Sequence, residues 1–192
     1  MKNFQRSDHS FSLCGLNCGL CSMKLDCYCP GCGGGAGNQG CAIAKCSMQH
    51  DRIEYCHLCR EYPCEKYDGI DEFDSFITHR NQLKDIKRFK EMGLVQYHAE
   101  LDRKIEILKC LLTDYNDGRH KSFFCIAVNL LALQDVEAVM NKLSARTCSD
   151  NLTPTERAAV AAELFQSVAE QKAVKLKLNK KAVKKRRSES LK

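Results

Sequence analysis

The chain has 192 residues, of which 44% are apolar and 28% charged, so its composition fits one medium globular domain or one small domain with an appendage. The net charge of +6 lies in the C-terminal segment, because residues 151–192 carry 11 basic and 4 acidic side chains, while residues 1–67 carry 7 and 6 and residues 68–150 carry 12 and 14. This near-neutral body excludes a broad basic surface for nucleic acid on residues 1–150.

The cysteines are concentrated near the N-terminus, since 11 of the 14 lie between Cys14 and Cys64. Clustered cysteines build either disulfide frameworks or metal sites. A disulfide framework is expected in a secreted protein, but the opening MKNFQRSDHSFSLCGL has no apolar stretch long enough for the core of a signal peptide. The longest apolar run, Phe123 to Leu133, is too short to span a bilayer. We therefore expect a cytoplasmic protein with reduced thiols that bind metal and no contact with a membrane.

Residues 14–67 carry no helical apolar pattern longer than a turn or two, so bound metal is expected to fold them. Three cysteine pairs have the Cys-x-x-Cys spacing that lets two sulfurs point at one ion. Because four thiolates complete one tetrahedral zinc, the simplest arrangement is two zinc sites, each supplying on the order of 10 kcal/mol of folding free energy. We expect Cys18, Cys21, Cys29 and Cys32 to form the first site, and Cys46, Cys56, Cys59 and Cys64 to form the second.

This pairing follows proximity in the sequence, and an interleaved pairing is the alternative. Cys27 is the expected bystander. Either His50 or His57 could replace a thiolate, but because thiols are in surplus both are interpreted as surface histidines. The glycine-rich residues 33–37 are interpreted as a connector and not as a phosphate loop, since they follow no strand. With Cys14 and Cys41 as further candidates, the predicted metal ligands are Cys14, Cys18, Cys21, Cys29, Cys32, Cys41, Cys46, Cys56, Cys59 and Cys64.

An iron–sulfur cluster is the alternative to zinc. Cys14-x3-Cys18-x2-Cys21 suits a [4Fe–4S] cluster and is the spacing of radical-SAM enzymes, and Cys56-x2-Cys59-x4-Cys64 is also compatible with a cluster. The chain has neither the length nor the strands for the barrel that radical-SAM enzymes need. A cluster would therefore make it a small redox protein or an enzyme accessory.

From about residue 70 the pattern becomes helical, with apolar residues at spacings of three and four. Gly93 and the turn Asn116-Asp117-Gly118 predict helix ends, and Ser122, Asp135 and the capping box Thr153–Glu156 predict helix starts. The expected helical pieces are a short one over 73–77, and helices over 83–90, 94–115, 123–131, 136–143 and 154–174.

No convincing strand is found, so the predicted fold is mainly α. We expect an irregular Cys-rich, metal-bound N-terminal module packed on a four- to five-helix bundle. The predicted boundaries are 1–67 for this module, 68–150 for the helical region, 151–174 for the C-terminal helix, and 175–192 for a basic, disordered tail.

The cysteine string resembles a cysteine-rich prokaryotic family, the domain of unknown function 3795. The resemblance is carried by Cys14-Gly15-Leu16-x-Cys18-x-x-Cys21, Cys29-x-Gly31-Cys32, Cys41-x-Ile43-x-x-Cys46 and Cys56-x-x-Cys59-x-x-x-Pro63-Cys64, and it extends to a helical segment over 115–131. It covers about residues 10–145. The family is generally taken to bind metal, with zinc suggested by its cysteines, and it has no agreed activity. The resemblance therefore implies metal binding and leaves the function open.

The primary hypothesis is a non-enzymatic metal-binding protein with two structural zinc sites and a protein partner. The alternative is an iron–sulfur redox protein or accessory, and the third is nucleic-acid binding through the tail that contains Lys184 to Arg187. Arg119 and Lys121 are interpreted as a solvated basic turn rather than an anion site, and Cys125 as a packed apolar thiol.

Overall fold

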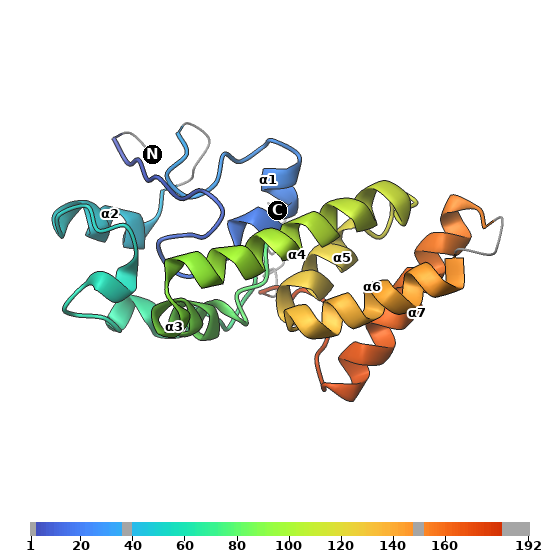
Figure 1. Cartoon of the computed structure of the whole chain (residues 1–192). Helices are drawn as coiled ribbons and strands as arrows, with labels where there is room; N and C mark the ends of the chain where they lie inside the picture. Colours follow the sequence, from blue (N-terminus) through green and yellow to red (C-terminus); the bar gives the residue numbers. More distant parts are fainter. Residues whose placement is uncertain (1–2, 36–39, 148–151, 182–192) are drawn as a thin grey trace, which may run out of the picture.

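The computed structural model describes residues 3–35, 40–147 and 152–181 (Figure 1). Within these ranges it is mainly α-helical, as predicted, and contains no strand. Its seven α-helices are α1 (Ser22–Leu25), α2 (Ala42–Gln49), α3 (Gln82–Met92), α4 (Leu94–Asp114), α5 (Lys121–Leu130), α6 (Leu133–Thr147) and α7 (Pro154–Gln171), with 3-10 turns η1 (Cys18–Leu20), η2 (Cys56–Leu58) and η3 (Glu65–Tyr67).

The N-terminal segment is mostly loop, and a buried arginine joins its parts. The guanidinium of Arg6 donates to the backbone carbonyls of Glu54 at 3.0 Å, Phe11 at 3.0 Å and Cys32 at 3.3 Å. Because a guanidinium has five N–H donors in a fixed plane, one side chain can hold three loops at once. Arg6 thus holds together loops that are not stabilised by helical hydrogen bonds.

Helices α3 to α7 agree with the sequence prediction within a few residues at their ends. Gly93 has φ 83°, a left-handed conformation that favours glycine, and separates α3 from α4. Thr153 and Glu156 form the predicted reciprocal capping box at the start of α7, with Pro154 in the first turn. The turn after α4 is also confirmed, since Asn116 Oδ1 accepts from the N–H of Gly118.

Three predicted details are wrong. Residues 71–80 form turns and loop, so the expected helical piece over 73–77 does not exist. Asp74 prevents it, because its side chain is fully buried and accepts from the N–H of His79 at 2.7 Å instead of facing solvent on a helix. Helix α5 starts at Lys121, before Ser122, and α6 starts at Leu133, so neither Ser122 nor Asp135 is an N-cap. Asp135 lies in the first turn of α6, where its charge favours the helix dipole.

Residues 174–181, which we call the C-terminal strap, lie along the 72–80 loop. Arg80 donates to the carbonyls of Lys175 at 2.6 Å and Lys177 at 3.0 Å. Asp74 and Asn179 exchange two hydrogen bonds of 2.7 Å, one from each backbone N–H. Residues 175–181 of the predicted tail therefore belong to the C-terminal strap, and the remainder of the tail lies outside the described residues.

The buried apolar side chains form one cluster that includes both the N-terminal segment and the helices. The ring of Phe11 is fully buried, with its centroid 5.1 Å from that of Phe89 on α3 and 4.8 Å from that of Tyr97 on α4. Figure 1 shows α2 and the cysteine-bearing loops at one end of the molecule and the antiparallel pair α6 and α7 at the other. None of the helices in the described ranges combines the length and apolar character needed to cross a membrane.

Candidate metal centre

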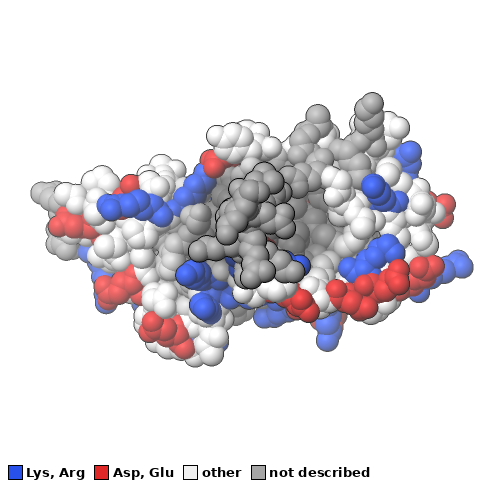
Figure 2. Space-filling view, turned by 180° about the vertical axis from the view of Figure 1, so that it is seen from behind, with Lys and Arg blue, Asp and Glu red and all other residues white. Residues whose placement is uncertain are grey.

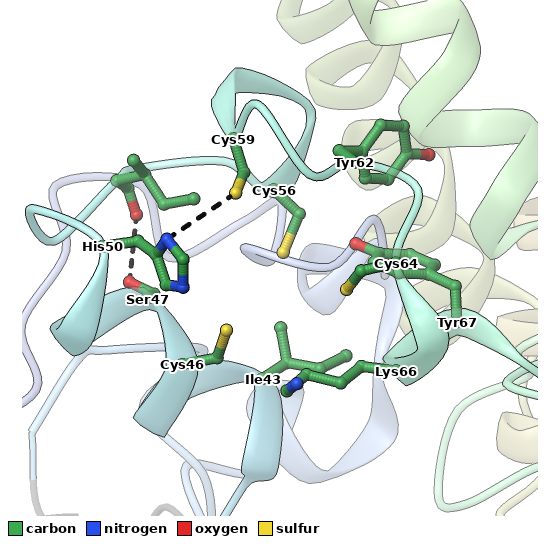
Figure 3. Close-up of a pocket in the computed structure, with 11 residues that line it drawn as sticks. Ile43, Cys46, Ser47, His50, Cys56, Cys59, Tyr62, Cys64, Lys66 and Tyr67 are labelled. Atoms are coloured by element: carbon green, nitrogen blue, oxygen red, sulfur yellow. Dashed lines mark hydrogen bonds between the residues drawn. The ribbon is translucent and has the colours of Figure 1, made fainter.

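Four thiols from three parts of the N-terminal segment face one pocket. Cys46 lies on α2, Cys56 begins η2, Cys59 directly follows it, and Cys64 directly precedes η3. Figure 3 shows their sulfur atoms pointing into the space between these elements, with His50, Lys66 and Tyr67 at its edge. The structure thus brings together the four residues predicted for the second zinc site.

Cys56 is the deepest of these thiols. Its pKa is raised to about 11, mainly by burial and also by the charges of Cys64, Cys46 and Cys59, against the lowering effect of a hydrogen bond with the hydroxyl of Tyr67. Cys56 therefore experiences the charge of each of the other three thiols of the pocket. A cation bound among them would relieve this repulsion.

The structure groups the remaining thiols differently from the sequence prediction. The pKa of Cys14 is raised to about 12, mainly by burial and also by the charges of Cys32 and Cys41. The pKa of Cys18 is also raised, first by burial and then by the charges of Cys32, Cys14 and Cys21. Neighbours in space are therefore Cys14, Cys18, Cys32 and Cys41, which we call the first thiol group.

Cys21 and Cys29, which were expected in the first site, adjoin each other and helix α5. The charge of Cys29 raises the pKa of Cys21, and the charge of Cys21 raises that of Cys125, although burial is the main cause for both. Cys125 is buried, as predicted, and Cys27 is exposed. The charge of Cys21 also raises the pKa of Cys18, so Cys21 adjoins the first thiol group as well as Cys29 and Cys125.

Tyr67 connects the pocket with the first thiol group. Its hydroxyl, which hydrogen-bonds Cys56, also donates to the backbone carbonyl of Cys14 at 3.4 Å. The charge of Cys56 in turn contributes to the raised pKa of Cys14. The two groups of four thiols are therefore neighbours, and they meet at Cys14 and Cys56.

No disulfide joins two of the described cysteines. Among residues 3–35, 40–147 and 152–181, no three His, Cys, Asp or Glu side chains stand in positions that could already hold a metal ion. The chemistry of the pocket nevertheless fits a thiolate-binding metal, since four soft sulfur donors face one space. Ligation requires these side chains to move closer together.

His50 is a pocket residue that the sequence prediction misplaced on the surface. It is half-buried, and its Nδ1 lies 4.0 Å from Cys59 Sγ (Figure 3). The spacing Cys46-x3-His50 on a short helix is the signal that could have found it, because residues four apart share a helix face. His57 is also half-buried, but its ring packs on those of Tyr55 and Phe89, with centroids 5.8 and 5.2 Å away.

The cations near the start of α5 are paired with carboxylates. Arg119 and His120 contact Asp117 at 3.1 and 2.8 Å, and Lys121 forms an ion pair with Asp26. These partners favour the interpretation of a solvated basic turn.

Comparison with known proteins gives no relative for this chain: no family model matches, and neither a curated protein nor a solved structure shows significant similarity. The resemblance to the domain of unknown function 3795 therefore stays a prediction that rests on the cysteine spacing.

Proposed function

We propose that this chain is a zinc-binding protein with two structural four-thiolate sites. The convergence of Cys46, Cys56, Cys59 and Cys64 on one pocket supports the first of them (Figure 3). Zinc is the metal for which four thiolates complete the coordination shell, leaving no position for a substrate. Such a site stabilises a fold and performs no reaction.

The other proposed zinc site, outside the pocket, is formed by the first thiol group. Cys14, Cys18, Cys32 and Cys41 repel one another as thiolates, and Cys32 is also influenced by the positive charge of Arg6, which lowers its pKa against the larger effect of burial. The two sites adjoin at Cys14 and Cys56, so binding at one helps to order the other through Tyr67.

The proposal includes the finer architecture expected from the sequence. Residues 1–67 form a metal-bound module that packs on the helices through Phe11 and its ring contacts. The protein acts in the cytoplasm by presenting a surface to a protein partner. The cytoplasmic location and the protein partner rest on the sequence alone.

Nucleic-acid binding is the less favoured alternative. On the face drawn in Figure 2, Lys and Arg side chains of the described residues are interspersed with Asp and Glu and form no continuous basic surface. Strong binding to nucleic acid requires such a surface or aromatic side chains on which bases stack. The hypothesis therefore depends on residues 182–192, which lie outside the described ranges.

Metal analysis of anaerobically purified full-length protein tests the proposal. We expect colourless protein with about two zinc ions per chain. Cys46→Ser should lower this content to about one, because it removes one ligand of the pocket, whereas the control Cys110→Ser on α4 should leave it at two. Brown protein that contains iron and sulfide, or protein purified without metal, would refute the zinc proposal.

A further inference from the structure

His50 is held in the pocket by the end of α2. It is the C-cap of this helix, and its backbone N–H donates to the carbonyls of Cys46 and Ser47, both at 3.1 Å. The chain then reverses through Asp51 and Arg52, whose φ angles of 53° and 55° are left-handed. The hydroxyl of Ser47 donates to the carbonyl of Ile53 beyond this reversal at 3.2 Å. These contacts fix the backbone on both sides of His50.

The hydrogen bond from the N–H of His50 to the carbonyl of Cys46 continues the helical turn to this C-cap and brings His50 over Cys46. Two residues four apart point in the same direction, which is the spacing that lets two side chains of one helix bind one zinc ion. Both side chains line the pocket, and Figure 3 shows them on the same side of it. The pocket therefore contains five metal donors, four sulfurs and one imidazole nitrogen.

The separation of His50 and Cys59 is close to that of two ligands of one ion. Zinc binds sulfur at about 2.3 Å and imidazole nitrogen at about 2.0–2.1 Å, so a tetrahedral angle brings the two donor atoms to about 3.5 Å from each other. In the structure, His50 Nδ1 and Cys59 Sγ are 4.0 Å apart. A side-chain movement of about half an ångström closes this difference.

Other groups of the pocket adjoin the remaining three thiols. The hydroxyl of Tyr67 hydrogen-bonds Cys56, and the charges of Cys46 and Cys64 raise the pKa of Lys66. The hydrogen-bond partner of the Cys59 thiol in the pocket is His50 itself. Cys59 is thus the proposed ligand that has another metal donor, His50, next to it.

We propose that His50 is a fifth donor of this site and that its Nδ1 takes the coordination position of Cys59 when the Cys59 thiolate is absent. In this exchange the Cys59 thiolate leaves zinc and takes one proton from solvent, while the lone pair of neutral His50 binds the ion, with its proton on Nε2. The charge of the complex changes from −2 to −1, and no electron is transferred. The site therefore keeps its ion when the Cys59 thiolate, the one beside His50, is lost.

This inference rests on the proposed metal binding, and ¹¹³Cd NMR of full-length protein loaded with ¹¹³Cd²⁺ separates the two. Wild type should show two resonances typical of cadmium bound by sulfur. In Cys59→Ala one of them should move upfield, because nitrogen replaces sulfur, while the other stays as an internal control for the fold. In Cys59→Ala/His50→Ala the moved resonance should disappear, and the affinity of this site for zinc should fall at least about tenfold relative to Cys59→Ala.

The matched control is Cys59→Ala/His57→Ala, whose spectrum should equal that of Cys59→Ala, since the His57 ring packs on Phe89. Loss of the resonance in Cys59→Ala alone, or its persistence in Cys59→Ala/His50→Ala, would overturn the role of His50 while leaving the metal site in place. Absence of sulfur-bound cadmium from wild type would instead refute the proposed function.

Discussion

Asp85 links the helices to the loop that carries Cys14 and Cys18. Its buried carboxylate accepts from Asn17 Nδ2 at 2.7 Å, and the hydroxyl of Tyr97 donates to Asn17 Oδ1 at 2.9 Å. Asn17 directly precedes Cys18, so this buried network helps to position the first thiol group. Burial raises the pKa of Asp85 to about 6, against the opposing charges of Lys104 and Arg88.

The raised pKa of Asp85 predicts a pH dependence of stability. Because the folded protein binds this proton more tightly than the unfolded chain, whose pKa is 3.8, the stabilising contribution is full below about pH 4 and is lost as the pH rises through about 6. Relative to Asp85→Asn, the free energy of unfolding of wild type should therefore increase by on the order of 1 kcal/mol between pH 7 and pH 5.

Urea unfolding of both proteins at both pH values measures this difference. Protonation of the thiols affects wild type and Asp85→Asn equally and cancels when the two are compared. If the free energy of unfolding of wild type minus that of Asp85→Asn stays constant or decreases from pH 7 to pH 5, the buried position of the carboxylate is contradicted.

At the scale of elements, the C-terminal strap lies along the 72–80 loop. The sequence predicted a short helical piece within this loop, over 73–77. Asp74 is central to it, because its carboxylate accepts from Thr78 Oγ1 at 3.2 Å and from the backbone N–H groups of His79 and Asn179 at 2.7 Å. Two of these donors belong to the loop and one to the strap. One buried side chain thus joins segments about 100 residues apart in the sequence.

Asp74→Ala should release the strap. Removal of the carboxylate leaves three donors unsatisfied at about 1 kcal/mol each, so we expect a loss of about 3 kcal/mol of stability. Cleavage by trypsin after Lys175 and Lys177, followed by mass spectrometry, should accelerate at least tenfold. Asp68→Ala, which removes an exposed carboxylate nearby, should cleave at the wild-type rate. Equal rates for Asp74→Ala and wild type would show that Asp74 does not hold the strap.

At the scale of the whole molecule, the N-terminal segment and the helices share one apolar core. Phe11, Leu13 and Leu20 are almost completely buried in the same cluster as residues of α3, α4 and α5. Loops that supply core side chains cannot unfold without exposing the helices that pack on them. Metal binding in the loops should therefore stabilise the entire chain.

Removal of metal by a chelator should lower the melting temperature of the whole protein in a single transition. Structural zinc supplies on the order of 10 kcal/mol, and 1 kcal/mol corresponds to about 2–4 °C in a chain of this size, so a decrease of at least about 10 °C is expected. Far-UV circular dichroism reports the helices. Tyrosine fluorescence reports mainly the N-terminal segment, which contains four of the six tyrosines, Tyr28, Tyr55, Tyr62 and Tyr67. Addition of zinc should restore the original transition. Helices that melt at an unchanged temperature would show that they fold independently of the metal.

Local patterns predicted much of the helical part correctly. The repeat of apolar residues located α3 to α7, and Gly93 and the Thr153–Glu156 capping box marked boundaries, because these signals act within one or two helical turns. The prediction of a helical piece over 73–77 was wrong. The apolar spacing there favours a helix, but Asp74 lies within it and bonds instead to partners that include the distant residue Asn179.

The sequence by itself determined that thiols dominate the N-terminal third and that helices follow, since composition and periodicity depend only on the order of residues. It also identified Cys46, Cys56, Cys59 and Cys64 as one group, because short loops separate them. Only the tertiary structure decided that Cys14 and Cys41 adjoin Cys32, that Cys21 turns toward α5, and that His50 enters the pocket. These neighbours depend on how Arg6, Asn17 and Phe11 fold the loops onto the helices, and that arrangement has no signature in the spacing of cysteines.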